Sequence, residues 1–208
     1  MRILRPASEN EMVAEFVKAE FESTRWGPYV KANMGRCGVT PAMLVDPDLT
    51  DADQNRRRHC LLSAYRGWRR DDALFRGWPD RLLWNLVAIE PKDIDQLRYA
   101  NADEWRRLSR DTWLPTVGAR RISEGDPTIL DEIPQDVIRK IARRIQAGEP
   151  LPRPIAIGTS YGNPIIFVEG HARITASLIA GIPDHLEIIH GATRLTLLKR
   201  WGFFPKPG

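Results

Sequence analysis

The chain contains 208 residues, of which 42% are hydrophobic and 28% are charged, as is ordinary for a globular protein. Its 31 basic and 27 acidic residues give a net charge of +4, which permits an anionic ligand without requiring nucleic acid. We expect a bacterial, cytoplasmic protein without membrane contact, because no segment approaches the roughly 20 apolar residues of a membrane helix and the start lacks the apolar run of a secretory signal.

The first 117 residues have patterns typical of helices. Ser8 can cap a helix that runs to about residue 25, since Glu11 follows three residues later and apolar residues then recur at helical spacing. Start and stop signals and apolar content predict further helical segments over 54–66, 80–89, 91–99 and 102–110. This pattern predicts an N-terminal helical region, residues 1–117, with little strand.

Cys37 and Cys60 are the two cysteines of the chain, and they form neither a CxxC pair nor a metal-ligand cluster. Cysteines without such a pattern are most often small buried side chains in a reducing compartment. We therefore predict two buried free thiols.

Residues 56–81 form a basic, aromatic segment in which eight arginines and three aspartates give a local charge of +5. Tyr65, Trp68, Phe75 and Trp78 are interleaved with these arginines. Such a mixture can stack bases and follow a phosphate backbone, but it is more often a helical core with solvated or paired arginines. The second interpretation is favoured, so nucleic acid is a possible but not a favoured partner.

The composition changes near Gly118, and residues 118–208 predict a small α/β domain. An amphipathic helix is predicted over 134–147, between Pro134 and Gly148. Strands are then predicted over 154–158, 165–168 and 185–190, with a helix over 169–181 between the last two and another over 192–201 at the end. The strand at 165–168 is apolar throughout and is therefore expected to be buried on both faces. The predicted fold class is α+β.

The junction from Glu169 to Arg173 is the most informative part of the sequence. A buried strand ends before Gly170 and a helix follows at once, so the first helical N–H groups, of Gly170, His171 and Ala172, can hold an anion. Arg173 can reach the same anion with a forked contact, or it can pair with a nearby acid such as Glu169. His171 can hydrogen-bond a phosphate or a hydroxyl. Glu169 can accept a proton or help to hold a metal ion, although it can also simply cap the helix.

This junction resembles that of the ParB/sulfiredoxin superfamily, in which a helix and a hairpin precede a G-x-x-R helix start. The resemblance covers residues 135–191 and implies that Gly170 and Arg173 hold nucleotide phosphates. His171 stands where sulfiredoxins have their catalytic cysteine, which excludes their chemistry. The segment Glu-Gly-His-Ala-Arg is most similar to the Asp-Gly-His-His-Arg of the family's free-serine kinases, without the second histidine.

The resemblance implies a nucleotide-binding protein that is a phosphotransferase from ATP or another nucleotide to a small hydroxylated substrate, with Mg²⁺. The alternative is a non-catalytic, nucleotide-responsive regulator or antitoxin-like module that contacts nucleic acid or a protein. Thr193 and Arg194 open the last predicted helix and are candidates for a second side of the ligand site. Glu124 and Asp126 are further candidates to face the ligand, because the family's first strand would fall near them.

Overall fold

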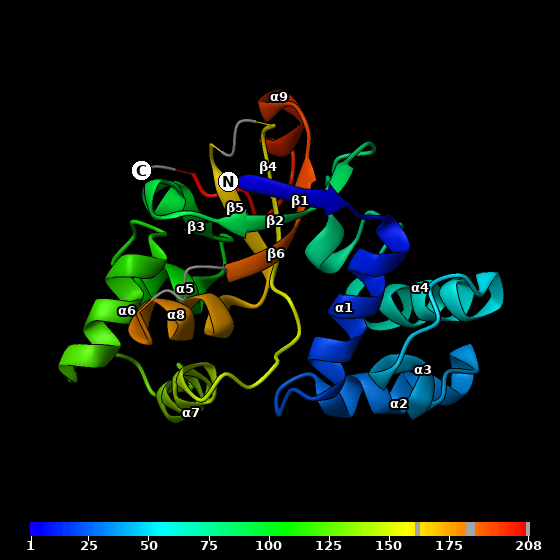
Figure 1. The fold of residues 1–208 in the computed structure, drawn as a ribbon, viewed down its shortest axis with the longest axis horizontal. Helices are drawn as coiled ribbons and strands as arrows, with labels where there is room; N and C mark the ends of the chain where they lie inside the picture. The colour runs from blue at the N-terminus through cyan, green and yellow to red at the C-terminus, as the bar shows by residue number, and fades with distance from the viewer. Residues whose placement is uncertain (161–162, 182–185, 207–208) are drawn as a thin grey trace.

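A computed structural model describes residues 1–160, 163–181 and 186–206. Its centre is a mixed six-stranded sheet in the order β1-β2-β6-β4-β5-β3, with helices on both faces (Figure 1). The strands are β1 (Arg2–Pro6), β2 (Leu83–Ile89), β3 (Leu97–Tyr99), β4 (Ile155–Gly158), β5 (Ile165–Glu169) and β6 (Leu186–Ala192). Helices around a mixed sheet agree with the predicted α+β class. Parts of two predicted segments, residues 161–162 of the turn before β5 and His185 at the start of the third strand, lie outside the described residues.

The first helical layer lies on one face of the sheet, where α1 (Glu9–Phe21) packs against β4. The helices α2 (Gly27–Cys37), α3 (Pro41–Val45) and α4 (Ala52–Arg66) pack against α1. The predicted cap of α1 is confirmed, because the Ser8 side chain accepts a hydrogen bond from the Glu11 N–H. Met12 and Phe16 of α1 share a buried cluster with Leu61 of α4 and with Ile166 and Val168 of β5. This layer therefore buries its apolar stripe against the sheet.

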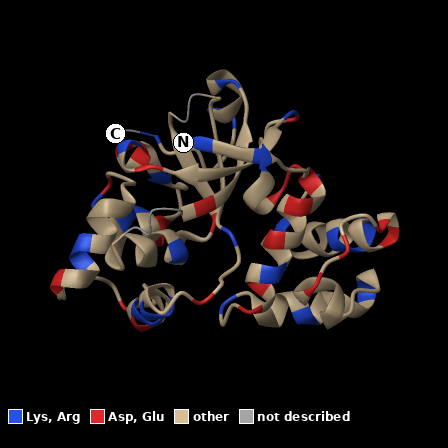
Figure 2. Cartoon of the chain, viewed as in Figure 1, with Lys and Arg blue, Asp and Glu red and all other residues tan. Residues whose placement is uncertain are grey.

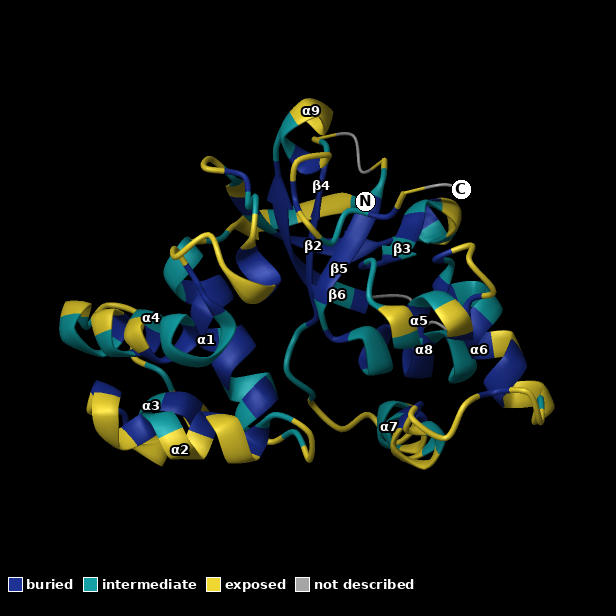
Figure 3. Cartoon of the chain, turned by 180° about the vertical axis from the view of Figure 1, so that it is seen from behind, coloured by how far each residue is buried: buried dark blue, intermediate teal, exposed yellow. Residues whose placement is uncertain are grey.

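The second helical layer covers the other face with α5 (Asp103–Leu108), α6 (Pro115–Glu124), α7 (Gln135–Gln146) and α8 (His171–Ile179). Ile165 and Phe167 of β5 belong to the cluster on this side, together with Ile138 of α7 and Ile174 of α8. Because alternate residues of β5 enter the two clusters, the prediction that this strand is buried on both faces is confirmed. Figure 3 shows β2, β4, β5 and β6 as the mostly dark, buried centre of the molecule, whereas the edge strand β1 is largely exposed.

Three strands lie where the sequence predicts helices or no regular structure. The segment 80–89, predicted as a helix, contains β2, which pairs along its whole length with β6 and also pairs with β1. The segment 91–99 is a 3₁₀-helix, η2 (Pro91–Gln96), followed by β3. An apolar run of this length does not distinguish a buried strand from a buried helix, and pairing with distant strands decides the outcome.

The prediction of a helical region over residues 1–117 is therefore wrong for β1, β2 and β3. The sheet takes strands from both sides of the predicted boundary between residues 117 and 118, which falls inside α6. At the other end of the chain, β6 continues to Ala192 and only α9 (Leu195–Leu198) is α-helical within the predicted helix over 192–201.

The prediction of two buried free thiols is also wrong. Cys37 and Cys60 form a disulfide between the end of α2 and the middle of α4, with their Cα atoms 5.7 Å apart, and Cys60 is exposed. The packing of α2 against α4 brings the two residues together. Nothing in their spacing along the chain indicates this packing, so the sequence pattern did not reveal the pair.

Reduction of this disulfide is expected to lower the free energy of unfolding by about 3 kcal/mol, because the unfolded chain gains the freedom of a loop that spans a sequence separation of 23 residues. Urea unfolding with and without reductant measures the difference. A variant with both cysteines replaced by alanine is the control and should be insensitive to reductant. Identical unfolding midpoints for the wild-type chain in both conditions would contradict the prediction.

Candidate functional site

The β5–α8 junction has the strand–glycine–helix geometry that the sequence predicts. Gly170 is the N-cap of α8 and has a φ of +90°, a conformation that side chains disfavour. A Cβ atom at this position would lie 2.8 Å from Cβ of Pro154, so the neighbouring loop also excludes a larger residue. Only glycine fits this turn without displacing the loop.

The N-terminus of α8 presents free backbone donors. The Ile174 N–H closes the first turn on the Gly170 carbonyl at 2.9 Å, whereas the N–H groups of residues 171–173 donate to no acceptor in the described part of the chain. These donors lie at the positive end of the helix dipole. They form a local environment that favours an anion.

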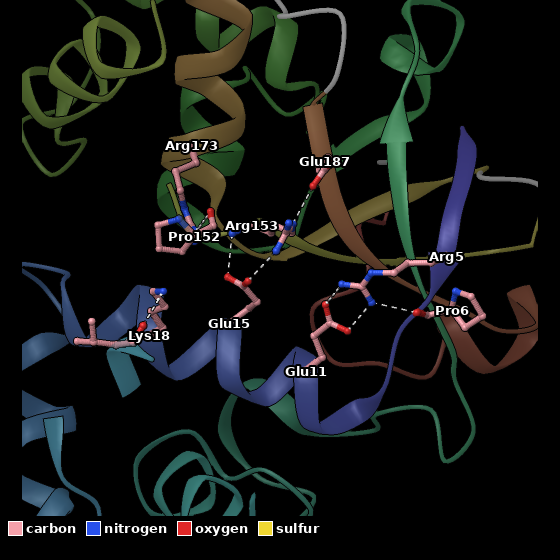
Figure 4. Close-up of polar contacts among 10 residues, drawn as sticks. Arg5, Pro6, Glu11, Glu15, Lys18, Pro152, Arg153, Arg173 and Glu187 are labelled. Atoms are coloured by element: carbon pink, nitrogen blue, oxygen red, sulfur yellow. Dashed lines mark hydrogen bonds and ion pairs between the residues drawn. The ribbon is translucent and has the colours of Figure 1, made fainter. Parts of the chain in front are cut away.

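Arg173 lies beside these donors, but its guanidinium contacts a carboxylate. The side chain is buried, forms an ion pair with Glu169, and donates a hydrogen bond to the Pro152 carbonyl (Figure 4 shows Arg173 and Pro152). Its Nη2 atom is 3.2 Å from the position of a Cβ on Gly170. A guanidinium has five N–H groups, so this pairing leaves donors for a further ligand.

Burial lowers the pKa of Arg173 to about 10, while Glu15, Glu20 and Glu22 of the facing layer act in the opposite direction. Arg173 therefore remains cationic at neutral pH. The carboxylate of Glu15 is already paired with Arg153 at 3.2 Å (Figure 4).

Glu20 is paired in the same way, with Nε of Arg66 at 2.9 Å. Two of the acidic groups that face Arg173 are thus held by other arginines. An incoming anion would compete mainly with Glu169, the direct partner of Arg173.

His171, the first residue of α8, is held by groups that follow β3. Its Nε2 atom accepts a hydrogen bond from the Ala100 N–H at 3.2 Å. Its ring stacks on Trp105, with centroids 5.2 Å apart and planes 16° apart. Burial lowers the pKa of His171 to about 4, so the imidazole is neutral at pH 7.

Thr193 and Arg194 do not join this site. The Thr193 N–H donates to the Gly158 carbonyl at 2.9 Å, at the end of β4 where Ala192 pairs with Gly158. Glu169 pairs with Ile155 at the opposite end of β4. Figure 1 accordingly shows α9 and α8 at opposite ends of the sheet, so the predicted second side of the pocket is wrong.

Asp126 and Glu124 are not placed at the junction either. The Asp126 carboxylate accepts hydrogen bonds from the Thr128 hydroxyl and from Arg121 at 2.6 Å, and these contacts hold its pKa well below the usual range. Glu124 is exposed at the last position of α6. Asp126 is therefore part of the turn that follows α6.

The basic segment 56–81 has the features of a core with paired arginines. Trp68 and Phe75 are buried and pack edge to face with ring centroids 4.7 Å apart. Seven of the eight arginines contact acidic side chains or backbone carbonyls. Figure 2 shows acidic and basic residues interspersed over this layer. These contacts favour the core interpretation over a nucleic-acid surface.

Four residues outside the predicted motif hold the junction, namely Ala100, Trp105, Pro152 and Pro154. Ala100 and Trp105 lie close to His171 because β3 pairs in parallel with β5, with Tyr99 opposite Phe167. No pattern in the sequence indicates this pairing. The sequence places the two prolines in the loop before β4. It does not predict the contact of Pro152 with Arg173 or that of Pro154 with Gly170, because these form only in the folded chain.

Two cavities lie away from the junction. One of about 340 Å³ is lined by Leu108, Arg121 and Ile133, and another of about 500 Å³ lies between α7 and the end of α8. Within the described residues, no helix is long and apolar enough to cross a membrane, and no group of three or more His, Cys, Asp or Glu side chains is arranged to hold a metal ion.

Comparison of the chain with protein-family models, with curated proteins and with solved structures finds no match.

Proposed function

We propose that this chain binds a nucleotide through its phosphates at the N-terminus of α8 and transfers a phosphoryl group from it to a small hydroxylated substrate. The observation that carries the proposal is that the N–H groups of residues 171–173 have no acceptor among the described residues, while the Arg173 guanidinium lies beside Gly170 at the same helix start. Backbone donors and a buried arginine together can hold a multiply charged phosphate. The order β4, β5, α8, β6 also matches what the resemblance to the ParB/sulfiredoxin superfamily implies.

The ion pair between Glu169 and Arg173 defines what phosphate binding must change. A phosphate at the helix start would use the remaining Arg173 donors or replace the Glu169 carboxylate. In the second case Glu169 becomes free at the end of β5, next to the bound phosphates. A carboxylate in that position can accept the proton of a substrate hydroxyl as it attacks the phosphorus atom.

The residues at the junction fit Mg²⁺ only when the ion binds together with the phosphates of a nucleotide. Glu169 is the carboxylate at the helix start, and Mg²⁺ is commonly held by one or two carboxylates together with substrate phosphates and water. When bound there, Mg²⁺ would supply neutralisation of the phosphate charge. His171 would hydrogen-bond the phosphate or the substrate.

A thermal-shift panel of ATP, ADP, CTP and GTP, each with and without Mg²⁺, tests the binding. A nucleotide at about 100 times its dissociation constant should stabilise the fold by about 2.7 kcal/mol. This corresponds to a rise in Tm of roughly 5–10 °C for a chain of this size. Sodium sulfate at equal ionic strength is the control for unspecific anion effects.

The panel also separates the two candidate functions. Phosphorus NMR of the stabilising nucleotide with small hydroxylated compounds reports transfer. Stabilisation without transfer would favour the nucleotide-responsive regulator, and no stabilisation by any nucleotide would refute the proposal.

A further inference from the structure

The two ring nitrogens of His171 have different environments. Nε2 accepts the Ala100 N–H at 3.2 Å, and a nitrogen that accepts a hydrogen bond carries no proton in the neutral ring. The proton of neutral His171 is therefore on Nδ1. Among the described residues, no hydrogen bond of Nδ1 is present. Nδ1 is thus an N–H donor without an acceptor in this part of the chain.

The ring is held in one orientation. Trp105 stacks on one face at 5.2 Å, and the Tyr99 ring lies 5.8 Å away. Both aromatic residues are buried. Tyr99 is further fixed by a hydrogen bond of 2.5 Å between its hydroxyl and that of Thr175, which lies one turn after His171 in α8. The direction in which Nδ1 donates is therefore set before any ligand binds.

The charged groups around His171 come from three elements and partly offset one another. Glu104 of α5 raises the pKa of His171, whereas Arg66 of α4 and Arg25, which precedes α2, lower it. Glu104 and Arg25 are themselves paired at 2.8 Å. Burial has the largest effect and keeps the imidazole neutral.

We infer that His171 binds a phosphate oxygen of the nucleotide as a neutral donor through Nδ1, with Ala100 and Trp105 as positioning residues that fix its tautomer and ring orientation. This inference rests on the proposed function. It assigns His171 a binding role that is distinct from that of a general base, because its Nε2 atom is engaged by the backbone and its Nδ1 atom carries a proton. Arg173 supplies the positive charge at the same site.

Two substitutions distinguish the contribution of Nδ1 to nucleotide binding from that of Nε2. In His171→Asn the side-chain amide can take the place of Nδ1, whereas in His171→Gln it can take the place of Nε2. Isothermal titration with ATP and Mg²⁺ should show a smaller loss of affinity for His171→Asn than for His171→Gln, because asparagine keeps the donor and loses only the contacts that orient it. The affinity of His171→Gln should fall by about tenfold, as for the loss of one hydrogen bond to a charged group. Equal weakening in both variants, or wild-type affinity in His171→Gln, would overturn the inference.

A measurement on the chain without nucleotide distinguishes failure of this inference from failure of the proposed function. Nitrogen-15 NMR of the full chain, with the signals of His171 assigned from their loss in His171→Asn, reports the tautomer directly. We expect the proton on Nδ1 at pH 7 and no protonation of Nε2 above about pH 5. A proton on Nε2, or titration near the ordinary histidine value of about 6.5, overturns the inference whether or not ATP binds.

Discussion

Replacing Arg173 by alanine is expected to abolish stabilisation by nucleotide and to lower the free energy of unfolding by about 3–5 kcal/mol, as for breaking a buried ion pair. The substitution leaves the Glu169 carboxylate without its cation and the Pro152 carbonyl without its donor. It also removes the cationic group that the proposal assigns to phosphate binding. Urea unfolding measures the first effect, and thermal shift with ATP and Mg²⁺ measures the second.

Two further variants make the Arg173 result interpretable. Arg173→Lys keeps the charge but loses the forked donor geometry, so we expect it to recover part of the stability and little of the nucleotide affinity. Arg144→Ala removes a half-exposed arginine of α7 that pairs with Glu149, and it should cost at most about 1 kcal/mol and leave nucleotide binding unchanged. An Arg173→Ala chain that is folded and still stabilised by nucleotide as much as wild type would refute the role of Arg173.

The local part of the candidate site could be predicted from the sequence. The apolar run before Glu169, the glycine, and the helical pattern that follows lie within about ten residues and specify a strand, a turn and a helix. The amphipathic helix α7 and the capped helix α1 could also be predicted from the sequence, because their patterns are local too. Short-range patterns of this kind can be interpreted without knowledge of tertiary contacts.

The remaining parts depend on contacts between distant residues. The apolar run 83–89 becomes a strand because β6, a hundred residues later, provides its hydrogen-bonding partner. Trp105 contacts His171 because of the β3–β5 pairing, and the disulfide forms because α2 packs on α4. From the sequence, Arg173 is expected to contact either a phosphate or a nearby acid such as Glu169, and the structure shows the pairing with Glu169.

Replacing Glu169 by glutamine is expected to lower the rate of phosphoryl transfer by at least about 100-fold, the usual contribution of a positioned general base. Affinity for ATP without Mg²⁺ should stay the same or increase, because a neutral amide no longer competes with phosphate for Arg173. A coupled assay with Mg²⁺ gives the rate, and titration with ATP alone gives the affinity. Wild-type turnover in this variant would exclude Glu169 as the base.

The matched control for Glu169→Gln is Glu187→Gln. Glu187 also pairs with an arginine, Arg153, at 2.9 Å, but it lies on β6 and is about a third exposed. Its substitution removes the same charge from the surroundings of α8 without removing the direct partner of Arg173. If both variants lose turnover equally, the loss reflects the local electrostatic field. If only Glu169→Gln loses it while retaining ATP, the carboxylate that Arg173 holds in the ligand-free chain is the group that accepts the proton.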